Sequence, residues 1–141
     1  MEDTWSLVTL PSYRTKPGPL CVAEIVKIAP GFFPGDAAPR VYWVVNDTPE
    51  RVVRGGHSHP PGGKREIMIV PMGKAVIHLH SPGRCGAVTL DAPDRALVLP
   101  NGIWHLVELE PASMLLAIVS TLFKVDEAVT EMDCGHRYVQ R

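Results

Sequence analysis

The chain has 141 residues, of which 45% are apolar and 21% charged, and its formal net charge is −1 at pH 7. This length and balance fit one globular domain, 1–141, and exclude a disordered or fibrous chain. The near-zero charge excludes the sustained basic field that nucleic-acid binding requires. No apolar run approaches the ~20 residues of a membrane helix. Residues 1–10 lack the basic start and apolar stretch of a signal peptide, so we expect a cytoplasmic protein with no membrane partner.

The predicted elements are strands, because fourteen prolines and twelve glycines divide the chain into many short segments. Apolar runs of strand length cover residues 20–28, 41–45, 66–70, 74–80, 96–99, 103–109 and 114–121. The spaces between them are mostly too short for crossover helices, so neighbours are predicted to pair antiparallel through turns such as 81–83 and 100–102. Residues 125–132 alone have a helical pattern. The sequence therefore predicts an all-β barrel or jelly roll with a short C-terminal helix.

The most informative stretch is Arg54-Gly55-Gly56-His57-Ser58-His59. On a strand, residues two apart point to the same face, so His57 and His59 are expected to present two imidazoles together. A second pair, His78 and His80, has the same spacing. There the intervening apolar residues form a continuous inward face, which predicts that both of these histidines point outward and have no functional role.

The segments around the first pair resemble the two motifs of the cupin superfamily, G-x5-H-x-H-x3-4-E-x6-G and G-x5-P-x-G-x2-H-x3-N. The matching positions are His57, His59, Glu66, Gly73, Pro100, Gly102 and His105. Six residues separate His59 from Glu66, where three or four are usual. The resemblance implies a cupin (RmlC-like) jelly-roll β-barrel.

One interpretation of these residues is a metal site. His57, His59, Glu66 and His105 resemble the three-histidine, one-carboxylate set of metal-binding cupins, and imidazole with carboxylate suits a divalent transition metal. Open coordination positions on such a metal would imply oxygenase, isomerase or lyase chemistry.

A second interpretation comes from a resemblance that extends from about residue 20 to residue 127. It rests on the segments Arg40-Val41-Tyr42-Trp43, Arg54-Gly55-Gly56-His57-Ser58-His59, Thr89-Leu90-Asp91-Ala92-Pro93, Trp104-His105, Ser120 and Asp126-Glu127. In order and rough spacing they resemble the WxcM-like nucleotide-sugar 3,4-ketoisomerases, a branch of the cupins. The resemblance implies an isomerase without a cofactor. It would move the keto group of a dTDP-4-keto-6-deoxyhexose from C4 to C3, and the chain would form a homodimer.

Such a reaction needs a proton removed from C3, an enediol, and a proton delivered to C4. Histidine suits these steps because it changes protonation near neutral pH. We therefore expect His57 and His59 to transfer protons, and the Tyr42 hydroxyl to hydrogen-bond the reacting sugar.

Four further residues are candidates for substrate binding. Arg54 is either a planar fork for an anionic or carbonyl group or a structural arginine at the strand end. Trp104 is either a platform for sugar or thymine or a buried indole at the barrel rim. His105 would line the pocket, and Glu66 would either pair with a protonated histidine, raising its pKa, or recruit a metal.

A third interpretation is a non-catalytic sugar-binding cupin, because a fold alone does not guarantee chemistry. The segment Thr15-Lys16-Pro17-Gly18 favours this view. It stands where the ketoisomerases usually have a D-x-R-G segment whose arginine helps to hold the nucleotide.

Overall fold

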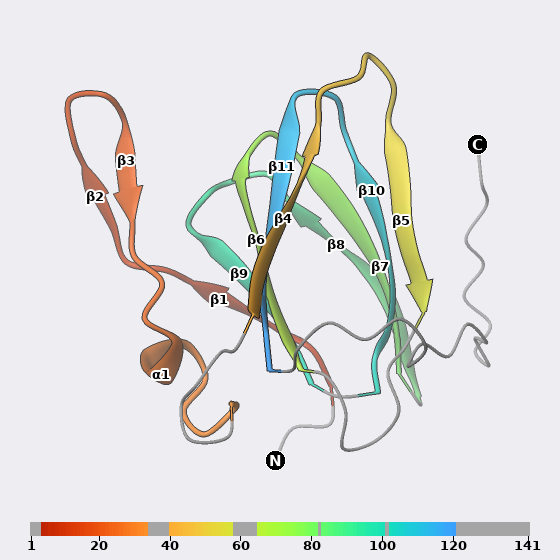
Figure 1. The fold of residues 1–141 in the computed structure, drawn as a ribbon. Coiled ribbons are helices and arrows are strands. Elements are labelled where there is room, and N and C mark those ends of the chain that lie inside the picture. The colour runs from red at the N-terminus through yellow and green to blue at the C-terminus, as the bar shows by residue number, and fades with distance from the viewer. Residues whose placement is uncertain (1–3, 34–39, 58–64, 82, 101, 121–141) are drawn as a thin grey trace.

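The computed structural model describes residues 4–33, 40–57, 65–81, 83–100 and 102–120. Within these ranges two antiparallel sheets face each other, and a separate two-stranded hairpin stands beside them (Figure 1). The five-stranded sheet has the order β1 (Ser6–Thr9), β9 (Arg95–Leu99), β6 (Glu66–Met72), β11 (Ser113–Val119), β4 (Arg40–Asn46). The four-stranded sheet has the order β5 (Val52–His57), β10 (Trp104–Leu109), β7 (Ala75–Ser81), β8 (Arg84–Leu90). The hairpin pairs β2 (Ser12–Arg14) with β3 (Pro19–Cys21), and α1 (Ile25–Ile28) follows it.

The main core lies between the two sheets, because alternate residues of each strand point inward. On β7, for example, Ala75, Ile77 and Leu79 are fully buried in a cluster that also contains Met68 of β6 and Val107 of β10. A second cluster covers the outer face of the five-stranded sheet. There Ile67 and Ile69 of β6 pack with residues of α1 and of the segment that follows it. The sheets therefore bury one large apolar layer between them and a smaller one beneath α1.

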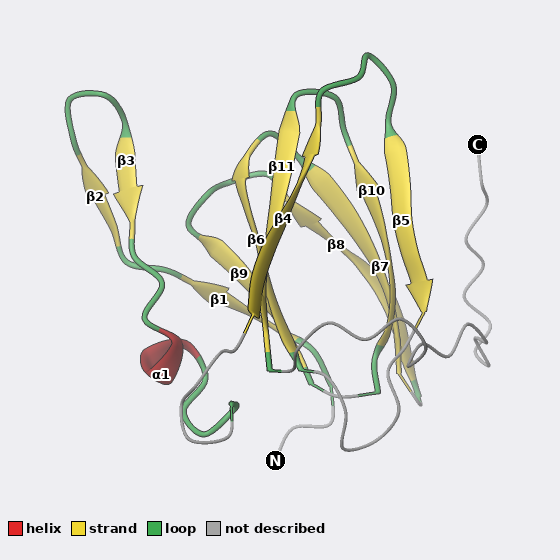
Figure 2. Cartoon of the chain, in the orientation of Figure 1, coloured by secondary structure: helices red, strands yellow, loops and turns green. Residues whose placement is uncertain are grey.

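Most of the predicted strands are confirmed, and strand dominates the described chain (Figure 2). Two predictions are wrong. The run 20–28 contains the end of β3 and the single turn of α1, because its apolar residues face the second cluster and not a ladder partner. The segment 100–102 does not join paired strands, since β9 belongs to the five-stranded sheet and β10 to the four-stranded one. The predicted antiparallel pairing of the strands on either side of residues 81–83 is confirmed, since Ser81 of β7 pairs with Arg84 of β8. The predicted helix at 125–132 lies outside the described residues.

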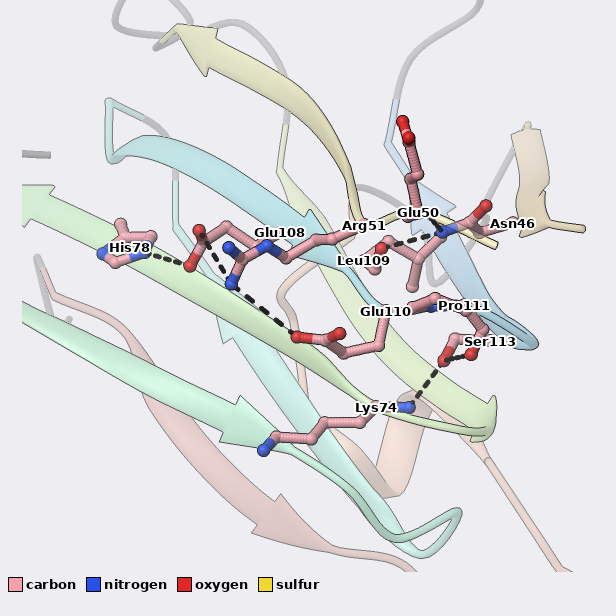
Figure 3. Close-up of polar contacts among 10 residues, drawn as sticks. All are labelled: Asn46, Glu50, Arg51, Lys74, His78, Glu108, Leu109, Glu110, Pro111 and Ser113. Atoms are coloured by element: carbon pink, nitrogen blue, oxygen red, sulfur yellow. Dashed lines mark hydrogen bonds and ion pairs between the residues drawn. The ribbon is translucent and has the colours of Figure 1, made fainter. Parts of the chain in front are cut away.

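At one end of the sandwich, the buried side-chain amide of Asn46 and the close packing of Gly73 against buried Ser113 join neighbouring strands. The side-chain nitrogen of Asn46 donates to the carbonyls of Glu50, at 2.8 Å, and Leu109, at 3.0 Å (Figure 3). Close by, Gly73 has φ +84°, and a Cβ there would lie 2.1 Å from the Ser113 hydroxyl. Only glycine fits this position, both because of the backbone angle and because of the close approach. The site described next lies at the opposite end.

No helix within the described ranges is long and apolar enough to cross a membrane.

Candidate active site

Four strands bring polar residues to one end of the sandwich. On the five-stranded sheet, Val119 at the end of β11 lies opposite Arg40, the first residue of β4, and opposite Glu66, the first residue of β6. On the four-stranded sheet, His57 at the end of β5 lies opposite His105 near the start of β10. The two sheets face each other, so these strand ends meet at the same end of the sandwich (Figure 1).

A glycine bulge sets the position of His57. The β5–β10 ladder shifts register between His105 and Leu106, which leaves Gly56 as an extra residue on β5. Gly55 and Gly56 have φ of +85° and +81°, and a Cβ on Gly55 would lie 3.0 Å from the His105 carbonyl oxygen. Glycine accepts such angles and such an approach without strain. The two glycines therefore bring the backbone of His57 directly opposite that of His105.

A hydrogen bond to the backbone of Ile103 orients the His105 ring. Its ring is buried, and its Nδ1 lies 3.1 Å from the Ile103 carbonyl oxygen. A carbonyl can only accept, so Nδ1 must carry the hydrogen of this bond. In the neutral ring the second nitrogen, Nε2, is then the basic atom, able to accept a proton or to bind a metal. His105 alternates with Ile103 and Val107 of the main core, so it lies on the inner face, as expected for a residue that lines a pocket.

Glu66 lies at the same end of the sandwich on the five-stranded sheet, where it is the first residue of β6. It is 1% exposed and alternates with Met68 and Val70, which belong to the main core, so its carboxyl group is on the inner face. A buried carboxyl group is stable only with polar company, so its place at the end of the core marks this end as polar. Glu66 and His105 are thus both buried on inward faces at the same end of the sandwich.

Tyr42 brings a hydroxyl group to the same end of β4. It lies opposite Ala117 of β11, which is fully buried, and burial raises the pKa of the tyrosine although nearby Arg40 and Arg54 lower it. Tyr42 is therefore protonated and able to donate a hydrogen bond throughout the neutral range. Its net pKa shift is upward because desolvation outweighs the two guanidinium charges.

Two arginines surround this tyrosine. The Arg40 guanidinium carbon lies 5.6 Å from the centre of the Tyr42 ring, within the range of a cation–π contact. Arg54 lies opposite the inward-facing Val107 and is exposed. Arg40 was not among the predicted site residues. Its even spacing from Tyr42 on one strand was the signal that could have identified it.

Trp104 lies on the other face of its strand. It precedes His105, so its side chain points away from the inner face, and its ladder partner is His80 of β7. The indole is 6% exposed, and its nitrogen has no hydrogen-bond partner in the part of the chain that the structure describes. The burial of the indole is compatible with a structural position, the predicted role as a platform for sugar or thymine stays a prediction, and by strand alternation Trp104 and His105 point to opposite faces of β10.

His78 and His80 point away from the main core, as predicted. His78 Nε2 lies 2.9 Å from a carboxylate oxygen of Glu108, and the Arg51 guanidinium lies 3.5 Å from the other oxygen of that carboxylate and 3.8 Å from Glu110 (Figure 3). His80 Nδ1 lies 3.2 Å from the Cys85 sulfur. Both histidines have interaction partners on the outer face of the four-stranded sheet. The sheet itself therefore lies between them and the residues of the inner face.

The remaining predicted residue, His59, lies outside the described residues, and for His57 only the backbone position is described. Among the described side chains, no group of three or more His, Cys, Asp or Glu residues is arranged to hold a metal ion. Two members of the predicted metal set, Glu66 and His105, are in the described part of the inner face. Their chemistry, a carboxylate and an imidazole whose Nδ1 donates to a carbonyl, suits a transition metal.

The two facing antiparallel sheets, with histidine and glutamate at one end of the inner face, define a jelly-roll protein of the cupin class. Within that class, the family model described as FdtA: WxcM-like, C-terminal matches residues 4–139. The chain therefore belongs to this family. No curated protein matches the sequence.

Several solved structures share the fold. One is a 3,4-ketoisomerase from Helicobacter canadensis, with a TM-score of 0.75 and 20% identity over 90% of each chain. Another is a histidine-to-asparagine mutant of the 3,4-ketoisomerase QdtA from Thermoanaerobacterium thermosaccharolyticum in complex with TDP-4-keto-6-deoxyglucose. Its TM-score is 0.77 at 20% identity, over 93% of this chain and 90% of that one. The TDP-quinovose 3,4-ketoisomerase WlaRB from Campylobacter jejuni has a TM-score of 0.77 at 22% identity, over 90% and 92% of the two chains.

Proposed function

We propose that this protein is a nucleotide-sugar isomerase that moves the keto group of a dTDP-4-keto-6-deoxyhexose from C4 to C3. The observation that carries the proposal is the bulged β5–β10 ladder, which sets His57 opposite His105 at the end of the sandwich where Tyr42 is kept protonated. Membership of the WxcM-like family supports it, as does the likeness to a 3,4-ketoisomerase with TDP-4-keto-6-deoxyglucose bound.

The reaction is a pair of proton transfers with no net redox change. A base removes the proton from C3 while an acid protonates the oxygen on C4, which gives a C3–C4 enediol. The proton of the C3 hydroxyl is then removed and a proton is added to C4, so that the carbonyl is on C3. Each step needs a group that both accepts and donates protons near neutral pH, and we assign these steps to His57 and His59.

Tyr42 would stabilise the charge that develops on the sugar oxygen. Its pKa is raised by burial, so it presents an O–H donor and not a phenolate at neutral pH. A donor fixed in position before the reaction stabilises an enediolate more than its ground-state carbonyl. Arg40 and Arg54 place positive charge near the same hydroxyl group. They would attract the anionic nucleotide and favour the enediolate.

Glu66 and His105 would complete the pocket. His105 is held with Nε2 as its basic atom, so it can accept a hydrogen bond from a sugar hydroxyl. Buried Glu66 would bind a second hydroxyl or hold a neighbouring histidine in its protonated form. Trp104, on the outer face, has no role in this proposal.

The test is deuterium exchange from heavy water into dTDP-4-keto-6-deoxyglucose. The wild-type protein should form the 3-keto isomer with deuterium on C4. The variants His57→Asn and His59→Asn should each lower turnover by about 10²–10⁴-fold, the usual contribution of a general acid or base. Binding of the sugar nucleotide, measured by calorimetry, should change little.

The matched control is His78→Asn, which alters the H-x-H pair on the outer face and should leave turnover unchanged. Wild-type protein that binds the sugar nucleotide without any exchange would overturn the proposal and favour a sugar-binding cupin. Full turnover in either His57→Asn or His59→Asn would show that the proton-transfer residue is wrongly assigned.

A metal-dependent cupin is the second candidate, favoured by the hydrogen bond from His105 Nδ1 to a carbonyl. Metal-binding histidines usually donate their other ring nitrogen in this way. His57, His59, Glu66 and His105 would hold the metal, which would polarise the carbonyl. Elemental analysis of the purified protein separates the two candidates. Near-stoichiometric metal that is lost in Glu66→Gln would establish the metal site, and metal-free protein with full turnover would exclude it.

A further inference from the structure

Two side chains of β10 lie against the outer side of the glycine bulge in β5. A Cβ on Gly56 would lie 3.5 Å from Leu106 Cδ1 and 4.0 Å from Trp104 Cζ2, which are ordinary van der Waals distances. These two residues flank His105 on β10, and they point outward because His105 points inward. The strand that brings His105 to the site therefore also supports the bulge from behind.

The bulge has no side chains of its own to fix it. Gly55 and Gly56 are consecutive, and both have a positive φ. Glycine has more backbone freedom than any other residue, so two in succession let His57 shift unless neighbouring atoms hold the backbone. On one side that neighbour is the His105 carbonyl oxygen, 3.0 Å from the position of a Cβ on Gly55. On the outer side, it is the pair of outward side chains of β10.

The indole of Trp104 is confined between the two strands that flank β10. On β5 its Cζ2 lies near Gly56, and on β7 its ladder partner is His80. His80 is itself buried, and its Nδ1 lies 3.2 Å from the Cys85 sulfur of the next strand, β8. Because protein interiors are close-packed, an indole that is 6% exposed in this setting has little space in which to move.

The polar atom of Trp104 does not account for a tryptophan at this position. The indole nitrogen has no hydrogen-bond partner in the described part of the chain, and a buried donor without a partner lowers stability. A phenylalanine would avoid that cost. Its single ring would not extend as far as the outer ring of the indole, to which Cζ2 belongs. The position therefore favours tryptophan for the size of its ring, which reaches Gly56.

We propose that Trp104 and Leu106 are positioning residues for His57. The two side chains hold the glycine bulge from the outer face and thereby keep the His57 backbone opposite that of His105. The inference rests on the proposed function, in which His57 transfers a proton. Displacing a reacting group by about 1 Å can lower the rate about 10²-fold. Packing on the outer face of the sheet therefore controls the rate of proton transfer on its inner face.

Steady-state kinetics of Trp104→Leu with dTDP-4-keto-6-deoxyglucose test the proposal. The kcat should fall about 10–100-fold, because His57 is no longer held in position. The KM should stay within about 3-fold of the wild-type value, since the substituted side chain lies on the outer face, away from the sugar. Leu106→Ala, which removes Cδ1, should have the same effect. Trp104→Phe, which keeps part of the ring, should lose less turnover than Trp104→Leu.

The matched control is Trp5→Leu. Trp5 is 5% exposed, and its Cζ2 also lies near a glycine, 3.5 Å from the position of a Cβ on Gly86. Gly86 belongs to β8, at the opposite edge of the four-stranded sheet from β5. Both substitutions remove a buried ring, so both variants should melt at a lower temperature than wild type. Assayed well below those temperatures, Trp5→Leu should keep its kcat within about 2-fold, because His57 is not displaced.

Backbone order parameters of Gly56 and His57, measured by NMR relaxation, give a readout that does not depend on activity. They should be about 0.85 in wild type and in Trp5→Leu, as in rigid backbone, and below about 0.6 in Trp104→Leu. An inactive wild-type protein would refute the proposed function, and these order parameters alone would then decide the role of Trp104. Unchanged order parameters in Trp104→Leu, or in an active protein a loss of kcat no larger than that of Trp5→Leu, would refute the positioning role.

Discussion

Substituting Gly73 by alanine tests the packing at the closed end of the sandwich. The new Cβ would lie 2.1 Å from the Ser113 hydroxyl and 2.6 Å from the Ser113 Cα, well inside contact distance. Because the nearest atoms include backbone, rotation of the Ser113 side chain cannot relieve the overlap. The Ser113 hydroxyl also accepts a hydrogen bond from the Lys74 backbone nitrogen at 2.9 Å, and that bond would be lost as β11 moves.

The expected cost combines three contributions. A positive φ costs a residue with a Cβ about 1–2 kcal/mol. Overpacking adds about 1–3 kcal/mol, and the lost hydrogen bond adds about 0.5–1.5 kcal/mol. Gly73→Ala should therefore lower the free energy of unfolding by about 2.5–6.5 kcal/mol, which for a chain of this size corresponds to a Tm roughly 10–25 °C lower.

Gly83→Ala is the matched control. Gly83 has a similar φ of +77°, but no described atom lies within 4 Å of the position of its Cβ. Its cost should be the backbone contribution alone, about 1–2 kcal/mol. Urea unfolding followed by circular dichroism measures both variants, and the denaturant m value should stay constant. If the two variants lost equal stability, the steric reasoning would be refuted.

Two further predictions concern groups at opposite ends of the sandwich. Asn46→Leu should lower the free energy of unfolding by about 1–3 kcal/mol, because the buried Leu109 carbonyl loses its donor. Urea unfolding of this variant beside Asp47→Leu, at an exposed position, would contradict this if the two variants lost equal stability. Tyr42 should titrate above the ordinary tyrosine pKa of 10.0, so its contribution to stability is complete below pH 10 and is lost as the pH rises further. The difference in tyrosinate absorbance between wild type and Tyr42→Phe measures that pKa, and a midpoint at or below the ordinary value would show that the arginine charges outweigh burial.

The sequence predicts well the strands whose apolar and polar residues alternate and the strands that are apolar on both faces. Residues 66–70 and 74–80 are continuous apolar or alternating runs, and both form strands within one or two residues of the prediction. It predicts less well the strands that are largely exposed to solvent or that contain glycines in place of apolar residues. β8, residues 84–90, has a single buried residue, and β5 contains Gly55 and Gly56, so neither has the expected apolar run. Pairing across long separations is not encoded locally, which explains why β9 and β10, the strands on either side of residues 100–102, belong to different sheets and do not pair as predicted.

Part of the site follows from residue spacing alone. His105 and Glu66 are on the inner face because each alternates with core residues, and the same parity predicts that Trp104, next to His105, points outward. The environment of Tyr42 could not be predicted. It depends on Arg54 of the other sheet, and no local pattern brings β4 and β5 together at that point.

The extra residue in β5 changes how this strand must be aligned with others. In a regular strand, the residue two positions after Arg54, which is Gly56, would be the ladder partner of His105. The observed partner is His57, one position later. Aligned without a gap against a regular strand, Gly56 would take the position opposite His105, and His57 would be matched one residue too far along. A comparison of this strand with a regular one therefore needs a one-residue gap at the glycine doublet, because the histidine keeps its partner only when the extra residue is left out of the count.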